Sequence, residues 1–163
     1  MPASAEERKQ EVTRLVETYS TLLLRVAMHQ TSNRSDAEDA VQMVFLKLLR
    51  LAPVFINAEH EKAWLIRVTI NQCHDIGRQV WNKRVTALTA SLPLPTKEQY
   101  PEVAEAVRAL PEKYSIVVFL YYFEGYSTAE VARLLEIPQN TVESRLHRAR
   151  ARLKNLLKED WDV

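Results

Sequence analysis

The clearest candidate chemistry in this sequence is the binding of phosphate by a cluster of cations near the C-terminus. Residues 139–158 contain six cations and a single acidic residue, Glu143. The cations are Arg145, Arg148, Arg150, Arg152, Lys154 and Lys158. Cations along a helix bind nucleic-acid phosphates, and polar side chains near the start of such a helix can reach base edges in the major groove. A basic stripe is also consistent with an ordinary solvated helix face, so the neighbouring segments are needed to choose between DNA binding and a solvated surface.

The segment before the basic residues has the pattern of a helix-turn-helix. Ser127-Thr128-Ala129-Glu130 has the spacing of a capping box and predicts the start of a short helix. Ile137-Pro138-Gln139 predicts a tight turn, after which the basic helix runs over residues 139–157. A capped helix, a short turn and a basic helix together favour binding to duplex DNA.

The basic helix has two predicted faces. Apolar residues spaced by four or three predict the buried face: Val142, Leu146, Ala149, Leu153 and Leu156. The opposite surface carries Glu143, Ser144, His147, Arg148 and Ala151, with Arg145, Arg150 and Arg152 along the flanks. We expect the first set to pack in the core and the second to meet DNA.

A second set of residues suited to nucleic acid lies in the first half of the chain. Residues 61–75 mix Trp64 with amides and cations, and Trp81-Asn82-Lys83-Arg84 follows. Aromatic and cationic side chains together suit single-stranded or melted DNA, because unstacked bases find flat partners there. Tryptophans in small domains are also often core residues, and residue chemistry alone leaves both interpretations open.

Acidic residues gather at the start of a further predicted helix, over residues 36–50. Ser35-Asp36-Ala37-Glu38 again has capping-box spacing. Asp36, Asp39 and their neighbours complement the helix dipole, which is one explanation of their position. A docking face for a basic partner, with Gln42, Phe45 and Leu46 alongside, is the other.

Metal and catalytic chemistry find no support in the residue spacing. The candidate ligands are His29, His60, Cys73, His74 and His147. Only Cys73 and His74 are adjacent, and neighbours on a helix point about 100° apart. The sequence has no CxxC or HxxxH spacing, no glycine-rich phosphate loop and no signature of a nucleophile with its base. We therefore expect no enzyme, no metal and no cofactor.

These residues are expected to lie on an all-α fold of two small domains. The sequence of 163 residues has only two glycines, Gly77 and Gly125, which disfavours strands joined by hairpins. Helical periodicity predicts helices over residues 12–27, 36–50 and 59–81, and again over 102–110 and 111–123. Prolines without periodicity predict a flexible linker over 85–101. The expected domains are thus a helical bundle at 1–84 and a helix-turn-helix domain at 102–163.

The composition predicts a cytoplasmic protein. Cys73 is the only cysteine, so an internal disulfide cannot form. The first ten residues have no apolar signal core, and no apolar run approaches the roughly 18 residues of a membrane span. We expect no membrane insertion.

Three segments together resemble the extracytoplasmic-function (ECF) class of sigma factors, in the sigma-70 family of bacterial RNA polymerase. They are AEDAVQMVFLKLLR, AWLIRVTINQCHD and STAEVARLLEIPQNTVESRLHRARARLK. The resemblance covers residues 15–157, in the order of the family. It implies a factor that binds core RNA polymerase, recognises the promoter −10 and −35 elements and promotes transcription initiation. It also implies a response to stress or to an envelope signal, and an anti-sigma factor as a further partner.

The resemblance implies roles for particular residues. Those matching the surface for core polymerase are Asp36, Asp39, Gln42, Phe45 and Leu46. Those matching the −10 region, where Asn71 aligns with the position that receives a flipped base, are Trp64, Arg67, Asn71, Arg78, Lys83 and Arg84. Those matching the −35 region are Glu143, Ser144, Arg145, His147, Arg148, Arg150 and Arg152. Two positions depart from the family pattern: Asn140 replaces a usual glycine, and Glu143 is acidic where relatives are often neutral or basic.

Two other functional classes were weighed against this one. One is a dimeric helix-turn-helix regulator that binds duplex DNA without polymerase. The other is a helical interaction protein whose cations serve only as a solvent-exposed polar surface. The array of Trp64, Arg67, Asn71 and Trp81 in the first half argues against the dimeric regulator, which would not need it.

Overall fold

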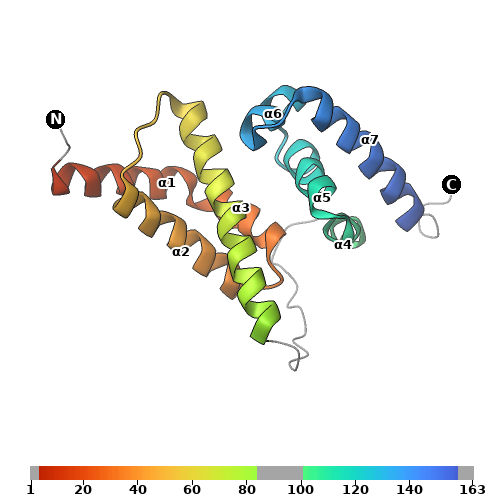
Figure 1. Ribbon diagram of the computed structural model, residues 1–163, viewed down its shortest axis with the longest axis horizontal. Helices are drawn as coiled ribbons and strands as arrows, with labels where there is room; N and C mark the ends of the chain where they lie inside the picture. The colour runs from red at the N-terminus through yellow and green to blue at the C-terminus, as the bar shows by residue number, and fades with distance from the viewer. Residues whose placement is uncertain (1–3, 84–100, 158–163) are drawn as a thin grey trace. The chain divides into compact units, whose positions relative to one another are not determined.

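The structure is a computed structural model that describes the backbone of residues 4–83 and 101–157 and the side chains of residues 4–77 and 102–157 (Figure 1). Every regular element within these ranges is helical, which confirms the expected all-α class. The chain divides into two compact units, Met1–Leu94 and Pro95–Val163. Residues 85–100 of the predicted linker lie outside the described residues, so its boundaries stay a prediction.

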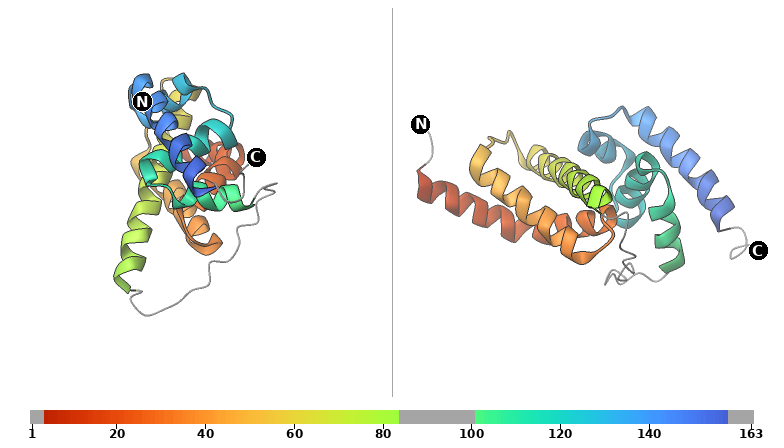
Figure 2. Two further views of the ribbon diagram at one scale, coloured as in Figure 1. Left: turned by 90° about the vertical axis from the view of Figure 1, so that its right-hand side faces the viewer. Right: turned by 60° about the horizontal axis from the view of Figure 1, so that its bottom comes forward.

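The first unit consists of three helices that pack against one another: α1 (Ala5–Gln30), α2 (Arg34–Leu51) and α3 (Ala58–Lys83). α1 and α2 lie side by side along much of their length (Figure 2). The core is built from apolar residues at helical spacing, which include Leu15, Leu23, Val44, Leu65 and Ile66. This core fixes which faces of α2 and α3 remain accessible.

The start of α2 corrects one prediction. The N-cap is Asn33, whose side-chain oxygen accepts a hydrogen bond of 2.8 Å from the backbone N–H of Asp36. Asn33 also donates from its amide to the Asp36 carboxylate at 2.9 Å. Ser35 therefore lies inside the first turn and does not cap the helix. Asparagine caps as well as serine does, and here it adds a second bond to the same aspartate.

The second unit contains α4 (Pro101–Ala109), α5 (Glu112–Val118), the π-helix η1 (Phe119–Phe123), α6 (Thr128–Leu135) and α7 (Gln139–Leu156). α4, α5 and α6 all pack against α7. Their shared core includes Val107, Val117, Leu120, Val131 and Leu146.

The helix expected over 111–123 does not stay regular. From Phe119 onward the backbone widens into a π turn, where the N–H of Glu124 donates to the Phe119 carbonyl at 3.0 Å. The N–H of Tyr126 then donates to the Leu120 carbonyl at 3.0 Å, and Gly125 takes a left-handed φ of 78°. Glycine adopts this conformation without strain, which explains its position after the helix.

The predicted helix-turn-helix is present. Ser127 and Glu130 form the expected capping box at the start of α6, with hydrogen bonds of 3.1 and 3.0 Å. α6 ends at Leu135 and is followed by Glu136 in the left-handed conformation, and Pro138 occupies the N-cap position of α7 without a side-chain hydrogen bond. Among the described residues, none of the helices combines the length and apolar character that a membrane span requires.

Candidate nucleic-acid interface

The buried face of α7 follows the predicted spacing for most of its length. Val142, Leu146 and Ala149 are buried and Leu153 is half-buried. Leu156, which was expected to continue this face, is 54% exposed. The prediction fails there because the helices that cover α7 leave its last turn uncovered.

The opposite surface of α7 is accessible to a ligand. The exposed residues are Glu143, Ser144, His147, Arg148, Arg150 and Arg152, and Arg145 is half-buried. Gln139 at the start of the helix donates from its amide to the Thr128 hydroxyl at 3.1 Å and to the Glu143 carboxylate at 3.5 Å. The amide of Gln139 therefore connects the first turns of α6 and α7 and faces the one acidic group of this surface.

Two tyrosines of the preceding helices hold arginines of α7. Nε of Arg150 donates to the Tyr122 hydroxyl at 2.6 Å, and the guanidinium lies 5.6 Å from the centre of the tyrosine ring. The Arg152 guanidinium lies 5.0 Å from the centre of the Tyr114 ring. Sequence reasoning missed both tyrosines, because they are far from the arginines along the chain.

The cations around Tyr114 change its titration. Burial of Tyr114 raises its pKa, but the hydrogen bond from Arg148 and the charges of Lys113, Arg148 and Arg152 outweigh burial and lower the pKa below its usual value. The ammonium of Lys113 lies 5.1 Å from the centre of the Tyr114 ring. The positive field that lowers this pKa also favours a bound anion such as phosphate.

α2 presents the residues expected to meet a protein partner. Asp39, Gln42 and Leu46 are exposed, and Asp36 and Phe45 are half-buried. Spacings of three and four place Asp39, Gln42 and Leu46 on one face of the helix. Met43 and Leu49, which sequence reasoning did not include, are also exposed on α2. An exposed surface with apolar and acidic groups together is typical of a protein interface.

α3 brings together three of the residues expected to act on melted DNA. Asn71 is exposed, and Trp64 and Arg67 are half-buried. Their spacing puts all three on one face of the helix. The Trp64 ring packs edge-on against Phe55, with ring centres 5.7 Å apart. The side chains of Arg78 and Lys83, and Arg84 as a whole, lie outside the described residues.

The segment between α2 and α3 lies beside this face. The N–H of Ile56 donates to Nδ1 of His60 at 3.1 Å, and the N–H of His60 donates to the Asn57 side chain at 2.8 Å. The Phe55 ring contacts the His60 ring edge-on, with centres 5.5 Å apart. These contacts leave the side chains of Val54 and Ile56 almost fully exposed.

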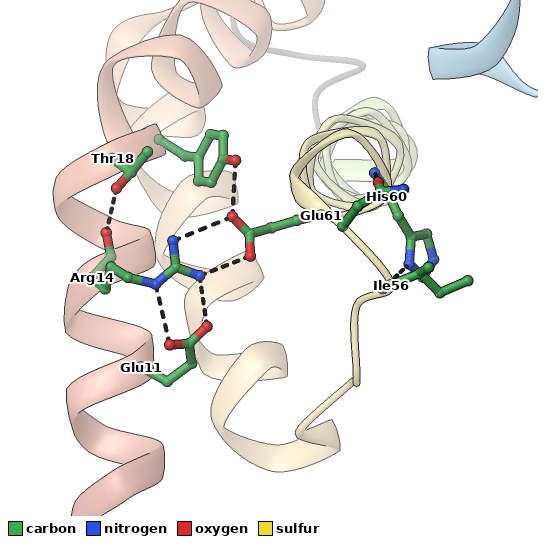
Figure 3. A network of polar contacts seen from close by, with 8 residues as sticks. Glu11, Arg14, Thr18, Ile56, His60 and Glu61 are labelled. Carbon is green, nitrogen blue, oxygen red and sulfur yellow. Dashed lines mark hydrogen bonds and ion pairs between the residues drawn. The ribbon is translucent and has the colours of Figure 1, made fainter.

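Glu61, which lies in the mixed polar segment of α3, has a structural role instead (Figure 3). Its carboxylate is buried, with 7% of the residue exposed, and accepts hydrogen bonds from Arg14 at 2.7 and 3.4 Å and from the Tyr19 hydroxyl at 2.9 Å. Arg14 also bonds Glu11 at 2.6 Å. The hydrogen bond with Glu11 and the one with Glu61 raise the pKa of Arg14, and Arg14 lowers the pKa of Glu11. This network holds the start of α3 against α1.

In the described ranges, no group of three or more histidine, cysteine, aspartate or glutamate side chains is arranged to hold a metal ion. Cys73 is buried in the first unit.

Comparison with protein families finds two matches that follow one another along the chain. The family described as "Sigma-70 region 2" matches residues 15–82, and the family described as "Sigma-70, region 4" matches residues 101–153. The first match covers the face of α2, the residues Trp64, Arg67 and Asn71 of α3, and Tyr19 and Glu61 of the Glu61 network. The second covers the helix-turn-helix and both tyrosines.

Several curated proteins are similar over most of the chain. The ECF RNA polymerase sigma factor SigM of Mycobacterium tuberculosis is 34% identical over 139 residues, covering 83% of this chain and 71% of the relative. The ECF RNA polymerase sigma factor SigL of the same species is 30% identical over 155 residues, covering 89% of this chain and 88% of the relative. The RNA polymerase sigma factor SigZ of Bacillus subtilis is 29% identical over 138 residues, covering 79% of this chain and 77% of the relative.

Two solved structures share the fold. The sigma factor RpoE of Bartonella quintana, in complex with the anti-sigma factor NepR, aligns with a TM-score of 0.71 and 24% identity, covering 91% of this chain and 98% of that one. CnrH in complex with the cytosolic domain of CnrY aligns with a TM-score of 0.69 and 24% identity, covering 96% of this chain and 93% of that one.

Proposed function

The chain belongs to the ECF class of the sigma-70 family, and from this membership we propose how its two units divide the work of transcription initiation. It is an RNA polymerase sigma factor, a regulator of transcription rather than an enzyme. The observation that carries the proposal is a capped helix-turn-helix whose basic helix α7 exposes its polar face. In the proposed division, residues 1–84 bind core polymerase and the −10 element, 85–101 are the linker, and 102–163 bind the −35 element.

The direct test is run-off transcription with core polymerase. We expect the purified chain to give core polymerase start-site-specific transcripts on a promoter template selected from a random pool. Core polymerase alone is the matched control. Duplex binding by the chain without any polymerase-dependent transcript would instead indicate an autonomous DNA-binding regulator.

The face of α2 is the proposed contact with core polymerase, through Asp36, Asp39, Gln42, Phe45 and Leu46. Its exposed acidic and apolar groups support this assignment. Asp39→Lys should weaken association with core by about tenfold or more, because like charges would meet a basic partner. Glu17→Lys makes the same charge change at an exposed position of α1 and is the matched control. Normal core binding by Asp39→Lys, with unchanged circular dichroism, would show that this face is misassigned.

The face of α3 is the proposed contact with the opened −10 element, through Trp64, Arg67 and Asn71 and the basic residues Arg78, Lys83 and Arg84. The exposure of Asn71 beside a half-buried tryptophan supports this. Asn71→Ala should lower open-complex formation on a linear template more than on a pre-melted bubble. Trp64 also packs on Phe55, so Trp64→Ala needs a folding control. Equal losses on linear and pre-melted templates would argue against a role in opening.

The polar surface of α7 is the proposed contact with the −35 duplex. Ser144, His147 and Arg148 are assigned to base edges, together with Glu143, which faces Gln139. The flanking Arg145, Arg150 and Arg152 are assigned to phosphates. Arg148→Ala should cost about 1–3 kcal/mol and relax preference at one base position if its contact is bidentate.

The comparison variant at this surface is Arg152→Ala. It should weaken all duplexes alike and flatten the salt slope by about one unit. Titration of matched and mismatched duplexes at two salt concentrations separates the two behaviours. Unchanged sequence preference in Arg148→Ala would remove its base-reading role.

We also propose a cytoplasmic location, because core polymerase and promoter DNA are there, and a response to stress or an envelope signal. An anti-sigma factor is the proposed regulator, since the solved structures of RpoE and CnrH are complexes with NepR and with the cytosolic domain of CnrY. Such a regulator should abolish run-off transcription when it is added before core polymerase. Full activity in its presence would argue against the pairing.

A further inference from the structure

The surface of α7 carries an arrangement that its arginines alone do not explain: a tyrosine contacts a guanidinium on each side of the helix. Arg152 lies on one side of α7, with its guanidinium 5.0 Å from the centre of the Tyr114 ring, and Arg148, four residues away, shares that side. Arg150 is two residues from each and projects to the other side, where Tyr122 contacts it. Both tyrosines come from the continuous segment α5–η1.

The Tyr122 pair has the geometry of a fixed, accessible cation. Nε of Arg150 donates to the Tyr122 hydroxyl at 2.6 Å, and the guanidinium lies 5.6 Å from the ring centre. This hydrogen bond uses one of the five N–H donors of arginine and leaves the two Nη groups for an anion. Tyr122 is 50% exposed and Arg150 is exposed, so a ligand can reach the pair.

The position of Tyr122 depends on the π turn. Tyr122 lies within η1, where the turn is wider than in an α-helix and the side chains project in altered directions. The Tyr121 ring packs edge-on against the Tyr122 ring, with centres 4.8 Å apart, and restricts it further. Such π turns occur frequently at functional sites. Here the turn delivers a hydroxyl to the flank of the basic helix.

We propose that Tyr122 is a positioning residue that orients Arg150 toward a DNA phosphate on one flank of α7. The inference rests on the proposed binding of α7 to duplex DNA and deepens it. An unrestrained arginine loses rotamer freedom when it binds phosphate, and a guanidinium already fixed by a neighbour loses less. Tyr122 thus acts through Arg150 and makes no phosphate contact of its own in this proposal.

The test is a double-mutant cycle in the full-length chain. The variants are Tyr122→Phe, Arg150→Ala and the two together, and the probe is a mixed-sequence DNA duplex. Phosphate contacts do not depend on sequence, so no promoter is needed. Tyr121→Phe is the matched control, because it removes a hydroxyl from the adjacent residue and keeps the ring that packs against Tyr122. Thermal unfolding of each variant monitors the fold.

Arg150→Ala should flatten the salt slope by about one unit. Tyr122→Phe should weaken binding by about threefold and flatten the slope in part, because one oriented hydrogen bond is lost. Tyr122→Phe should add nothing in the Arg150→Ala background, and Tyr121→Phe should bind as the original chain does. A merely structural role for Tyr122 would lower the unfolding temperature and leave the salt slope unchanged.

Three results would overturn the inference while leaving duplex binding intact. These are unchanged binding by Tyr122→Phe, tighter binding by Tyr122→Phe, or an equal loss with and without Arg150. The second would mean that Tyr122 holds Arg150 away from DNA, and the third that it acts by another route. Absence of salt-dependent duplex binding by the original chain would instead overturn the proposed function of α7, and the inference with it.

Discussion

Removal of the Glu61 carboxylate should destabilise the first unit in a way that depends on Tyr19. Glu61→Ala leaves the hydroxyl of Tyr19, which is buried, without its acceptor at 2.9 Å. Loss of the hydrogen bond between this hydroxyl and the carboxylate costs about 1–3 kcal/mol. The Arg14 side chain is 48% exposed, so loss of its ion pair adds only about 0.5–1 kcal/mol. The expected cost of Glu61→Ala is therefore about 1.5–4 kcal/mol.

The Tyr19 effect in two backgrounds gives the sharper test. Tyr19→Phe alone should cost about 1 kcal/mol, because it removes a hydrogen bond to a carboxylate. In the Glu61→Ala background the same change should cost less, because that hydrogen bond is already lost. Urea unfolding followed by tryptophan fluorescence, in a background in which Trp161 of the second unit is replaced by Phe, reports on this unit, since Trp64 and Trp81 belong to it. Glu59→Ala, at an exposed position of the same helix, should stay within about 0.5 kcal/mol.

The reasoning about Glu61 would be refuted by either of two results. One is Glu61→Ala within about 0.5 kcal/mol of the original chain. The other is the same cost of Tyr19→Phe in both backgrounds, since the hydroxyl would then not depend on the carboxylate.

Three further expectations concern single positions. Gly125→Ala should destabilise by about 1–2 kcal/mol, since its left-handed φ strains any L side chain. Gly77→Ala should stabilise by about 0.5–1 kcal/mol, since a Cβ at this helical position meets open space. Urea unfolding should show opposite signs for the two changes in the free energy of unfolding, and a shared sign would contradict the assignment. Ser127→Ala should cost about 1 kcal/mol by the same measurement, through loss of the N-cap of α6, and an unchanged unfolding midpoint would contradict it. Tyr114 should ionise below the pH of an ordinary tyrosine in an ultraviolet titration, and Arg148→Gln should move its pKa upward. Because the folded-state pKa is the lower one, the stability from this shift is full above the ordinary value of about 10 and is lost as pH falls through the folded-state pKa, so its contribution at neutral pH should be close to nil.

The elements themselves were predictable because the signals that define them are local. The capping box at Ser127 and the glycine at Gly125 specify their backbone within a few residues, and both are confirmed. The cap of α2 shows where local patterns compete. Asn33 and Ser35 both precede an acidic residue at a spacing that suits a cap, and only the structure shows that Asn33 is used.

The interactions that position the site were not predictable, because they join residues far apart in the sequence. Glu61 stands among aromatic, amide and cationic residues, yet its partners are Arg14 and Tyr19 on another helix. Tyr122 meets Arg150 from within η1, which departs from α-helical geometry, and no residue pattern marked that departure. Periodicity placed Leu156 on the buried face, but it does not show where the covering helices end.

The π turn at Phe119–Phe123 has a consequence for how this segment can change length during evolution. A π turn holds more residues than the α-helical turn it replaces, so it is a place where a helix accommodates an additional residue. Deletion of one residue there would let the turn become α-helical while the residues after it keep their direction relative to α5, whereas deletion within a regular turn rotates them by about 100°. The same deletion elsewhere in α5 would shift its buried residues out of register with α7. Tolerated single-residue insertions and deletions should therefore concentrate in η1, and those that occur there should change the partner of Arg150 before they change the core.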